Sequence, residues 1–195
     1  MDLAISNWIF DTFGNSKALA IIFRIITELG CKWAIITAVA VLLIFKKTRK
    51  LGIYAMFACG LAFFINNLIL KNVVERVRPF VENPELAKMS ELASYELPDG
   101  YSMASGHSTA SMALAVTIML FHKKLGFATI PYALLVGLSR IFLCVHYLTD
   151  VLVGFAIGTA LAVGVYFLFN YLSKTYLEKK ENKNEKTNLG NKESA

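Results

Sequence analysis

Residues 151–172 read VLVGFAIGTALAVGVYFLFNYL and contain no charged side chain. A helix needs about 20 apolar residues, at 1.5 Å each, to cross roughly 30 Å of hydrocarbon. This run is therefore expected to span a membrane. The composition of the whole chain agrees, because 56% of its 195 residues are hydrophobic, which is more than one soluble core of this size needs.

Four other regions are apolar enough to enter the bilayer. Three are clear, at residues 51–70, 105–121 and 125–145, whereas the region 17–45 holds two shorter runs around a polar break. The first of these runs contains Arg24, so it can span, tilt or only dip into the membrane. We predict an all-α fold, a polytopic membrane helical bundle with five to six transmembrane helices.

The end of the chain has a different composition. The sequence TYLEKKENKNEKTNLGNKESA at residues 175–195 is rich in Lys, Asn and Glu and has no apolar periodicity. Such segments bury too little apolar surface to fold. We therefore predict a membrane domain at residues 1–177 and a disordered polar tail at 178–195.

The net charge of +6 comes mainly from lysines and arginines clustered between the apolar runs, at 46–50, 123–124 and in the tail. The positive-inside rule places these connectors in the cytoplasm, so no nucleic-acid partner is needed to explain them. Alternation of the spans then puts the loop 80–104 and the link 146–150 outside. We expect a multi-pass protein of the cell membrane with a cytoplasmic tail.

The outer loop carries five carboxylates against the single Lys88. A metal site there is conceivable, but the spacing matches no calcium or zinc loop. We predict a solvated, partly helical loop and no metal site.

Polar residues at the outward helix ends form three clusters. In the first, Lys71 ends the run 51–70 and Arg78-Pro79 follows it, and on a continuing helix residues 71, 74, 75 and 78 would share one face. Snorkelling cations would explain this cluster alone, with Glu75 neutralising Arg76. The outward side, however, is where the positive-inside rule predicts few cations.

In the second cluster, Ser105, Gly106 and His107 precede the apolar run that ends near residue 121. Ser105 is a suitable helix N-cap, and the free N–H groups of a helix start bind phosphate. In the third cluster, Arg140 lies among apolar residues, and His146 and Asp150 are four residues apart. A carboxylate at this spacing can hold Nδ1–H of the imidazole and leave Nε2 free to react.

These motifs resemble the type 2 phosphatidic acid phosphatase superfamily, whose signature is KxxxxxxRP, PSGH and SRxxxxxHxxxD. Here the three parts are Lys71-NVVERV-Arg78-Pro79, Ala104-Ser105-Gly106-His107 and Ser139-Arg140-IFLCV-His146-YLT-Asp150. Ala104 replaces the proline of the second part, which affects rigidity more than chemistry. The motifs cover residues 71–150.

The resemblance implies a lipid phosphatase in which His146 is the nucleophile, Asp150 orients it, and His107 is the acid and base. It also implies phosphate binding by Lys71, Arg78, Ser105, Gly106 and Arg140. Three fixed cations can replace magnesium, so we expect no metal and no cofactor. The expected substrate is a lipid phosphate in the bilayer, with undecaprenyl diphosphate favoured because small members with an outward site resemble phosphatases of that lipid.

Other functions remain open from the sequence. Phosphatidylglycerophosphate or phosphatidate is an alternative substrate, and transfer of the phosphate to another lipid is an alternative reaction. The superfamily also resembles vanadate haloperoxidases, but those are soluble. An anion transporter would need polar groups through the midplane, where the spans contain few beyond Asn66 and Asn67. The sequence does not determine the oligomeric state.

Overall fold

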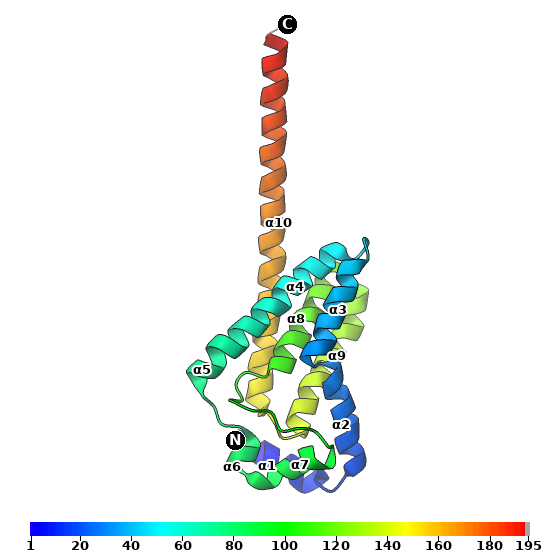
Figure 1. Ribbon diagram of the computed structural model, residues 1–195, viewed down its shortest axis with the longest axis vertical. Helices are drawn as coiled ribbons and strands as arrows, with labels where there is room; N and C mark the ends of the chain where they lie inside the picture. The colour runs from blue at the N-terminus through cyan, green and yellow to red at the C-terminus, as the bar shows by residue number, and fades with distance from the viewer. Residues whose placement is uncertain (194–195) are drawn as a thin grey trace.

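The computed structural model describes residues 1–193, with side chains to Tyr176 and at Lys180. Every regular element within residues 1–193 is helical (Figure 1). In chain order these are α1 (Asp2–Phe13), α2 (Lys17–Leu29), α3 (Lys32–Ile44), α4 (Arg49–Phe64), the π-helix η1 (Ile65–Leu70), α5 (Lys71–Val74), α6 (Pro79–Glu82), the 3₁₀ helix η2 (Pro84–Leu86), α7 (Ala87–Leu92), α8 (Gly106–Phe121), α9 (Lys123–Phe142) and α10 (Leu148–Glu193).

Helix α8 lies at the centre of the bundle and packs against α10, α9 and α4. Small side chains allow this close approach, since Ala113 and Ala115 are almost completely buried. Gly158 of α10 lies against α8, and a methyl group there would be 2.3 Å from the Thr109 carbonyl oxygen. The GxxxG pair Gly154 and Gly158 therefore packs helices within one chain.

The predicted spans correspond to helices of the bundle. Among the described residues, three helical segments are long and apolar enough to cross a membrane. They are Arg49–Glu82, which begins with α4; Lys123–Phe142, which is α9; and Leu148–Tyr176, the first part of α10. The pair α2 and α3, bent by 41°, makes a fourth when it is counted as one span. Helix α8 is apolar but has only 16 residues, about 24 Å of helix. The finding is thus three or four candidate spans, below the five to six predicted.

Helix α4 continues through η1 and α5 to Val74, but no further. Glu75 adopts a left-handed conformation with φ 47° and ends the helix, and Arg78 has an extended backbone. The predicted shared helical face of residues 71, 74, 75 and 78 is therefore wrong. A left-handed residue turns the chain, so Arg78 reaches its place from a non-helical segment.

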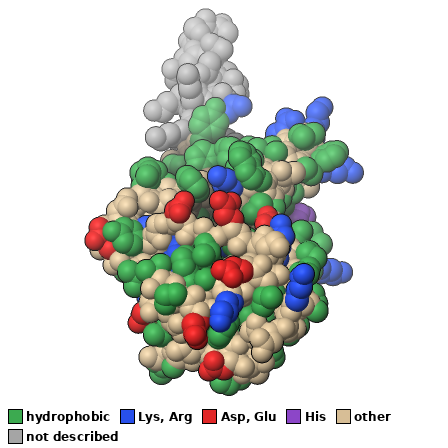
Figure 2. Space-filling view, turned by 60° about the horizontal axis from the view of Figure 1, so that its bottom comes forward, with side chains coloured by type: hydrophobic (Ala, Val, Ile, Leu, Met, Phe, Trp, Pro, Cys, Tyr) green, Lys and Arg blue, Asp and Glu red, His purple; other side chains and the backbone are tan. Residues whose placement is uncertain are grey.

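The loop 80–104 and α1 cover one end of the bundle. Helices α1, α6 and α7 lie together there, at the bottom of Figure 1. Figure 2 shows this end from the front, with acidic side chains scattered over it among apolar and basic ones. Helix α10 extends from this end to Glu193 and passes the domain boundary predicted at residue 177. Most side chains of the tail, residues 178–195, lie outside the described part of the structure. The predicted disorder of this tail therefore stays a prediction.

Candidate active site

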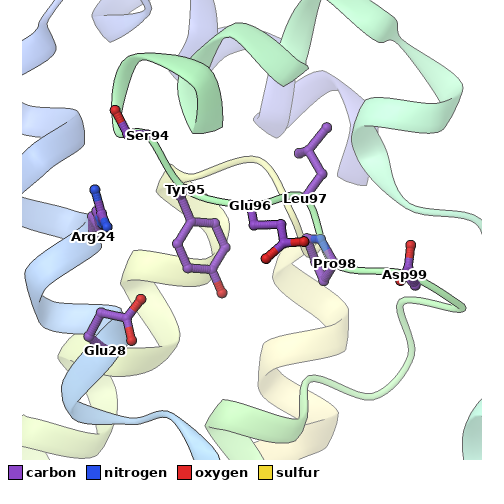
Figure 3. A pocket seen from close by; sticks show the side chains of 8 residues that line it. All are labelled: Arg24, Glu28, Ser94, Tyr95, Glu96, Leu97, Pro98 and Asp99. Atoms are coloured by element: carbon purple, nitrogen blue, oxygen red, sulfur yellow. The ribbon is translucent and has the colours of Figure 1, made fainter.

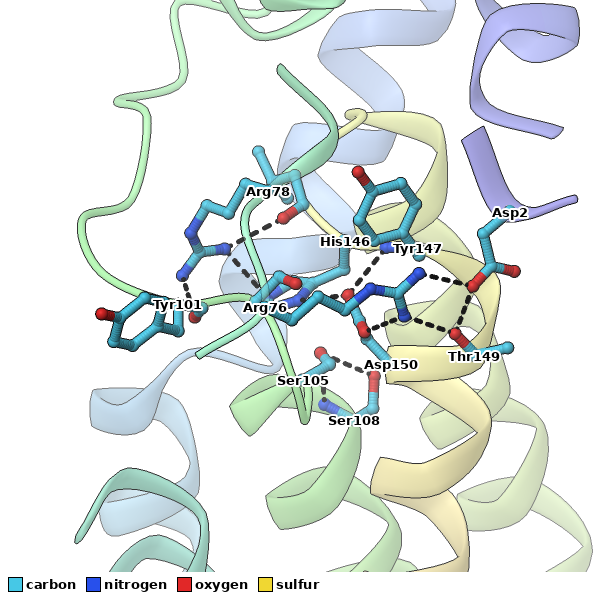
Figure 4. Close-up of polar contacts among 12 residues, drawn as sticks. Asp2, Arg76, Arg78, Tyr101, Ser105, Ser108, His146, Tyr147, Thr149 and Asp150 are labelled. Atoms are coloured by element: carbon cyan, nitrogen blue, oxygen red, sulfur yellow. Dashed lines mark hydrogen bonds and ion pairs between the residues drawn. The ribbon is translucent and has the colours of Figure 1, made fainter. Parts of the chain in front are cut away.

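Arg78 is buried on the segment that follows α5, where backbone carbonyls surround its guanidinium group. Nε donates to Gly100 O at 2.9 Å, Nη1 to Val145 O at 2.9 Å, and Nη2 to the carbonyls of Asp99 and Tyr101, each at 3.1 Å (Figure 4). These partners fix the side chain but carry no negative charge. Its positive charge is therefore available to an anion in the site.

His146 lies between Arg78 and Asp150 in the link from α9 to α10. Arg78 Nη1 is 3.3 Å from Nε2 of the imidazole. Because guanidinium has only donors, Nε2 must be the acceptor there and the ring proton sits on Nδ1. Nδ1 is 3.6 Å from Asp150 Oδ2, slightly too long for a hydrogen bond. Nδ1 of His146 thus faces Asp150 without a hydrogen bond, and the lone pair of Nε2 faces Arg78. That Asp150 orients the imidazole stays a prediction.

The surroundings of His146 keep its imidazole neutral. Burial lowers the pKa of His146 to about 3, the charges of Arg140 and Arg78 act in the same direction, and Asp150 opposes them. A neutral imidazole has the lone pair that a nucleophile needs.

Arg140, near the end of α9, is completely buried in the bundle. Its Nη1 donates to Thr27 Oγ1 at 2.7 Å and to the Tyr95 hydroxyl at 2.8 Å. Nε has no partner, and no carboxylate among the described residues is within ion-pair distance of this guanidinium. A buried cation with neutral partners favours an anionic ligand.

Helix α8 begins at the site, as the sequence predicts. Ser105 is its N-cap and accepts from Ser108 N at 3.4 Å and from Ser108 Oγ at 2.9 Å. The Ser105 hydroxyl is thus engaged inside the helix start. Gly106 and His107 form the first turn, where amide groups are free to bind an anion.

The π-helical turn η1 brings one further polar group to this helix start. Asn66 is completely buried, and neither of its side-chain polar atoms has a partner. Its Nδ2 would be 3.3 Å from a Cβ at Gly106. π-Helical turns in α-helices often occur at functional sites. From the sequence, Asn66 is only a polar residue within an apolar span.

One cavity of about 480 Å³ unites most of the predicted residues. Lys71, Arg78, Gly106, His107, Arg140 and His146 line it. Ser105 and Asp150 are buried and do not line it. The lining also contains residues outside the motifs, among them Glu28, Lys32, Tyr95 and Asp99. The three motifs lie between residues 71 and 150 of the sequence. Residues from all three therefore line a single cavity.

The partners of Arg76 were not predicted from the sequence. Nη1 donates to Asp150 Oδ1 at 2.8 Å and Thr149 Oγ1 at 2.6 Å, and Nη2 to Asp2 Oδ2 at 2.7 Å (Figure 4). Thr149 also donates to Asp2. Glu75, the neutralising partner considered from the sequence, is exposed and makes no ion pair with Arg76.

The residues 94–99 separate this cavity from a second one of about 570 Å³. Figure 3 shows Arg24 and Glu28 of α2 on one side and Tyr95, Glu96 and Asp99 on the other. Both cavities share Glu28, Tyr95, Pro98 and Asp99. Among the described residues, no three His, Cys, Asp or Glu side chains are grouped so that they could hold a metal ion.

The sequence pattern of the PAP2 superfamily matches residues 50–174, more than half of the chain. The chain belongs to the PAP2 superfamily. Its motifs 71–150 fall inside the matched region, and its helical bundle is that of solved PAP2 proteins. A transmembrane PAP2-type phosphatidylglycerolphosphate phosphatase from Bacillus subtilis superposes with a TM-score of 0.69 at 25% identity, covering 87% of this chain and 85% of that one.

Two curated PAP2 relatives differ in the lipid their names specify. An undecaprenyl-diphosphatase from Sulfolobus acidocaldarius is 32% identical over 136 residues, which are 69% of this chain and 63% of that protein. Phosphatidylglycerophosphatase B from Bacillus subtilis is 30% identical over 145 residues, 70% of this chain and 68% of that protein. The chain thus matches less than two thirds of the first relative's length.

Proposed function

We propose that this protein is a membrane lipid phosphatase that works through a phosphohistidine. One observation carries the proposal: the two histidines and three cations line the same cavity, and neither Arg78 nor Arg140 has a carboxylate bound to it among the described residues. Buried cations without acidic partners suit a phosphate group.

In the first step, Nε2 of His146 attacks the phosphorus atom. The bond from phosphorus to the leaving oxygen breaks. His107, whose proton is stabilised by the negative charge of the bound phosphate, gives that oxygen its proton. Asp150 stabilises the positive charge that develops on the His146 ring. Arg78, whose Nη1 already lies 3.3 Å from Nε2, moves its contact to a phosphoryl oxygen.

In the second step, water replaces the histidine. His107, now neutral, removes a proton from the water, whose oxygen bonds to phosphorus while the bond to Nε2 breaks. Lys71, Arg78 and Arg140 stabilise the equatorial oxygens in both steps, together with the amide groups at Gly106 and His107. Ser105 contributes chiefly by capping this helix start. No metal or other cofactor takes part in this scheme.

The substrate we favour is undecaprenyl diphosphate, converted to undecaprenyl phosphate. The undecaprenyl-diphosphatase relative at 32% identity supports this choice, whereas the relative named for phosphatidylglycerophosphate supports the alternative. The motifs themselves contact only the phosphate, so they fit either head group.

The membrane placement that we propose has five crossings. The first crossing is the pair α2 and α3, and the second is the segment Arg49–Glu82, which begins with α4. Helices α8, α9 and α10 are the other three. Basic connectors lie at the end opposite the site, which supports an extracytoplasmic active site and a cytoplasmic tail. The lipid then presents its phosphate at the outer surface while its tail stays in the bilayer.

The test is phosphate release by the purified, detergent-solubilised protein in EDTA. Undecaprenyl diphosphate, phosphatidylglycerophosphate and phosphatidate are offered in parallel, with His146→Ala as control. We expect release that survives EDTA, is lost in the variant, and is fastest with undecaprenyl diphosphate. Activity of His146→Ala that depends on added metal would contradict the mechanism. A phosphorylated lipid acceptor in place of free phosphate would indicate a phosphotransferase.

A further inference from the structure

A second, apolar space lies between α3 and α4. It has a volume of about 470 Å³, and its lining includes Ile35, Val39 and Leu43 of α3 and Met56, Gly60 and Phe63 of α4. We call it the α3–α4 groove. Lys32 is the only charged residue among those that line it. The groove therefore suits a hydrocarbon chain, with one cation at one end.

The α3–α4 groove adjoins the catalytic cavity. Lys32, Phe63 and Ala110 line both spaces. From Lys32 to Leu43 the groove follows α3 for about 16 Å, roughly half of the hydrocarbon thickness. A lipid with its phosphate in the catalytic cavity would thus find an apolar path one leaflet long.

Lys32 occupies the junction of the two spaces. It is exposed at the first position of α3, and its ammonium group lies 5.3 Å from the centre of the Trp33 ring. No carboxylate among the described residues forms an ion pair with it. Lys71, Arg78 and Arg140 lie in the catalytic cavity beyond this junction. The site therefore offers one cation to a second phosphate, on the lipid side of the first.

We propose that the α3–α4 groove binds the substrate tail and that Lys32 binds the lipid-side phosphate of a diphosphate head group. This inference rests on the proposed function and deepens it. In the reaction, the bond between the terminal phosphorus and the bridging oxygen breaks. His107 protonates that oxygen, and the lipid monophosphate is left at Lys32.

The first experiment fills the groove. A side chain at Gly60 would meet no atom within 4 Å, and the same is true of Gly164 on α10, which lines neither space. We would compare Gly60→Phe with Gly164→Phe on two prenyl diphosphates, one long and one with a tail too short to reach residue 60. The long-to-short ratio of kcat/KM should fall about tenfold in Gly60→Phe and stay at the wild-type value in Gly164→Phe.

An equal long-to-short ratio of kcat/KM in both glycine variants would overturn the tail site. It would mean that the groove holds bulk lipid and not the substrate tail. If Gly60→Phe does not fold, Ile36→Trp narrows the same groove from the opposite wall at an exposed position. The same fall in the ratio is expected for it, and a wild-type ratio in Ile36→Trp would likewise refute the inference.

The second experiment tests Lys32 with a lipid diphosphate and a lipid monophosphate of the same tail. In Lys32→Gln the diphosphate-to-monophosphate ratio of kcat/KM should fall about tenfold, and Lys32→Arg should restore it. Lys17→Gln is the control, since Lys17 is exposed on α2 and lines neither space. Equal losses on both lipids would overturn the role of Lys32. Failure of the wild-type protein to hydrolyse any lipid phosphate would instead refute the proposed function.

Discussion

Arg76 and Arg78 are two residues apart, yet they have opposite electrostatic surroundings. Arg76 is paired with the carboxylates of Asp2 and Asp150, so its charge is neutralised within the protein. Arg78 is held by four backbone carbonyls, which orient the guanidinium without neutralising it. The extended backbone before Pro79 directs the two side chains to different partners.

Arg76 is thus a cation neutralised within the protein, whereas Arg78 has no acidic partner among the described residues. His146 lies between the two systems, with Arg78 at its Nε2 and Asp150, which Arg76 holds, near its Nδ1. One arginine thus faces Nε2, the atom proposed to react, and the other holds the carboxylate near Nδ1. If this comparison is right, changes to the two arginines should have different kinetic effects.

The largest effect is expected for Arg78→Lys. Lysine keeps the charge but cannot bind the four carbonyls and a phosphoryl oxygen together. Loss of a fixed donor that stabilises the transition state typically costs about 10²–10³ in kcat. We expect a fall of that size in kcat/KM for phosphate release. A fall below tenfold in a folded variant would show that Arg78 does not contact the phosphoryl group.

Arg76→Gln should have a smaller effect. It removes one ion pair from the buried Asp150 without touching the cavity, and such supporting contacts are typically worth about 10–100-fold. We expect kcat to fall in that range with KM little changed. Lys124→Gln is the control, because Lys124 is exposed at the start of α9 and lines neither the cavity nor any other space discussed. A rise in KM alone would mean that Arg76 binds substrate.

The pH dependence tests the environment of His146. The folded pKa of about 3 lies below the ordinary value of about 6.5, so between these values the unfolded chain binds more protons. This group therefore lowers stability as pH falls from about 6.5 towards 3, by at most about 1.4 kcal/mol per pH unit, and contributes no slope above 6.5. Thermal unfolding of wild type and His146→Gln should show a shallower acid slope in the variant. An unchanged slope would contradict a neutral His146.

The smallest effect is expected for Asp2→Asn. Asp2 is outside the cavity and partly accessible, and hydrogen bonds from Thr149 and Arg76 lower its pKa although burial acts to raise it. Removing its charge should cost about 1 kcal/mol or less and reduce kcat a few fold through Arg76. Asp11→Asn, at an exposed position of the same helix, should change neither. Equal effects in both variants would mean that α1 has no specific link to Asp150.

Local patterns predicted much of this architecture. The apolar runs at 51–70, 105–121 and 125–145 became helices with closely similar bounds, because a span of hydrocarbon requires a run of apolar residues wherever it occurs. Ser105 was predicted as an N-cap from its own neighbours, and it is one. The sequence did not predict the bend between α2 and α3. Gly30 at this bend packs closely against Val136 of α9, and a contact with a distant helix is not visible in local patterns.

The errors concern contacts over long sequence separations. The prediction of one helical face from Lys71 to Arg78 was wrong because the helix ends at Glu75. The helix propensities of these residues do not reveal that end. Arg76 was noted as an excess cation, but its partners are residues 2 and 150. In the sequence Lys32 is one polar residue between two apolar runs, and only the packing of α3 beside α4 places it in the lining of two spaces.

Neighbouring residues alone were enough to predict the apolar helices and the three motifs of the PAP2 superfamily, because hydropathy and motif spacing are local properties of the sequence. Only the tertiary structure decided which cations stay without an acidic partner, since that depends on carboxylates brought together from distant parts of the chain. It also created the α3–α4 groove, because a space between two helices exists only after they have packed.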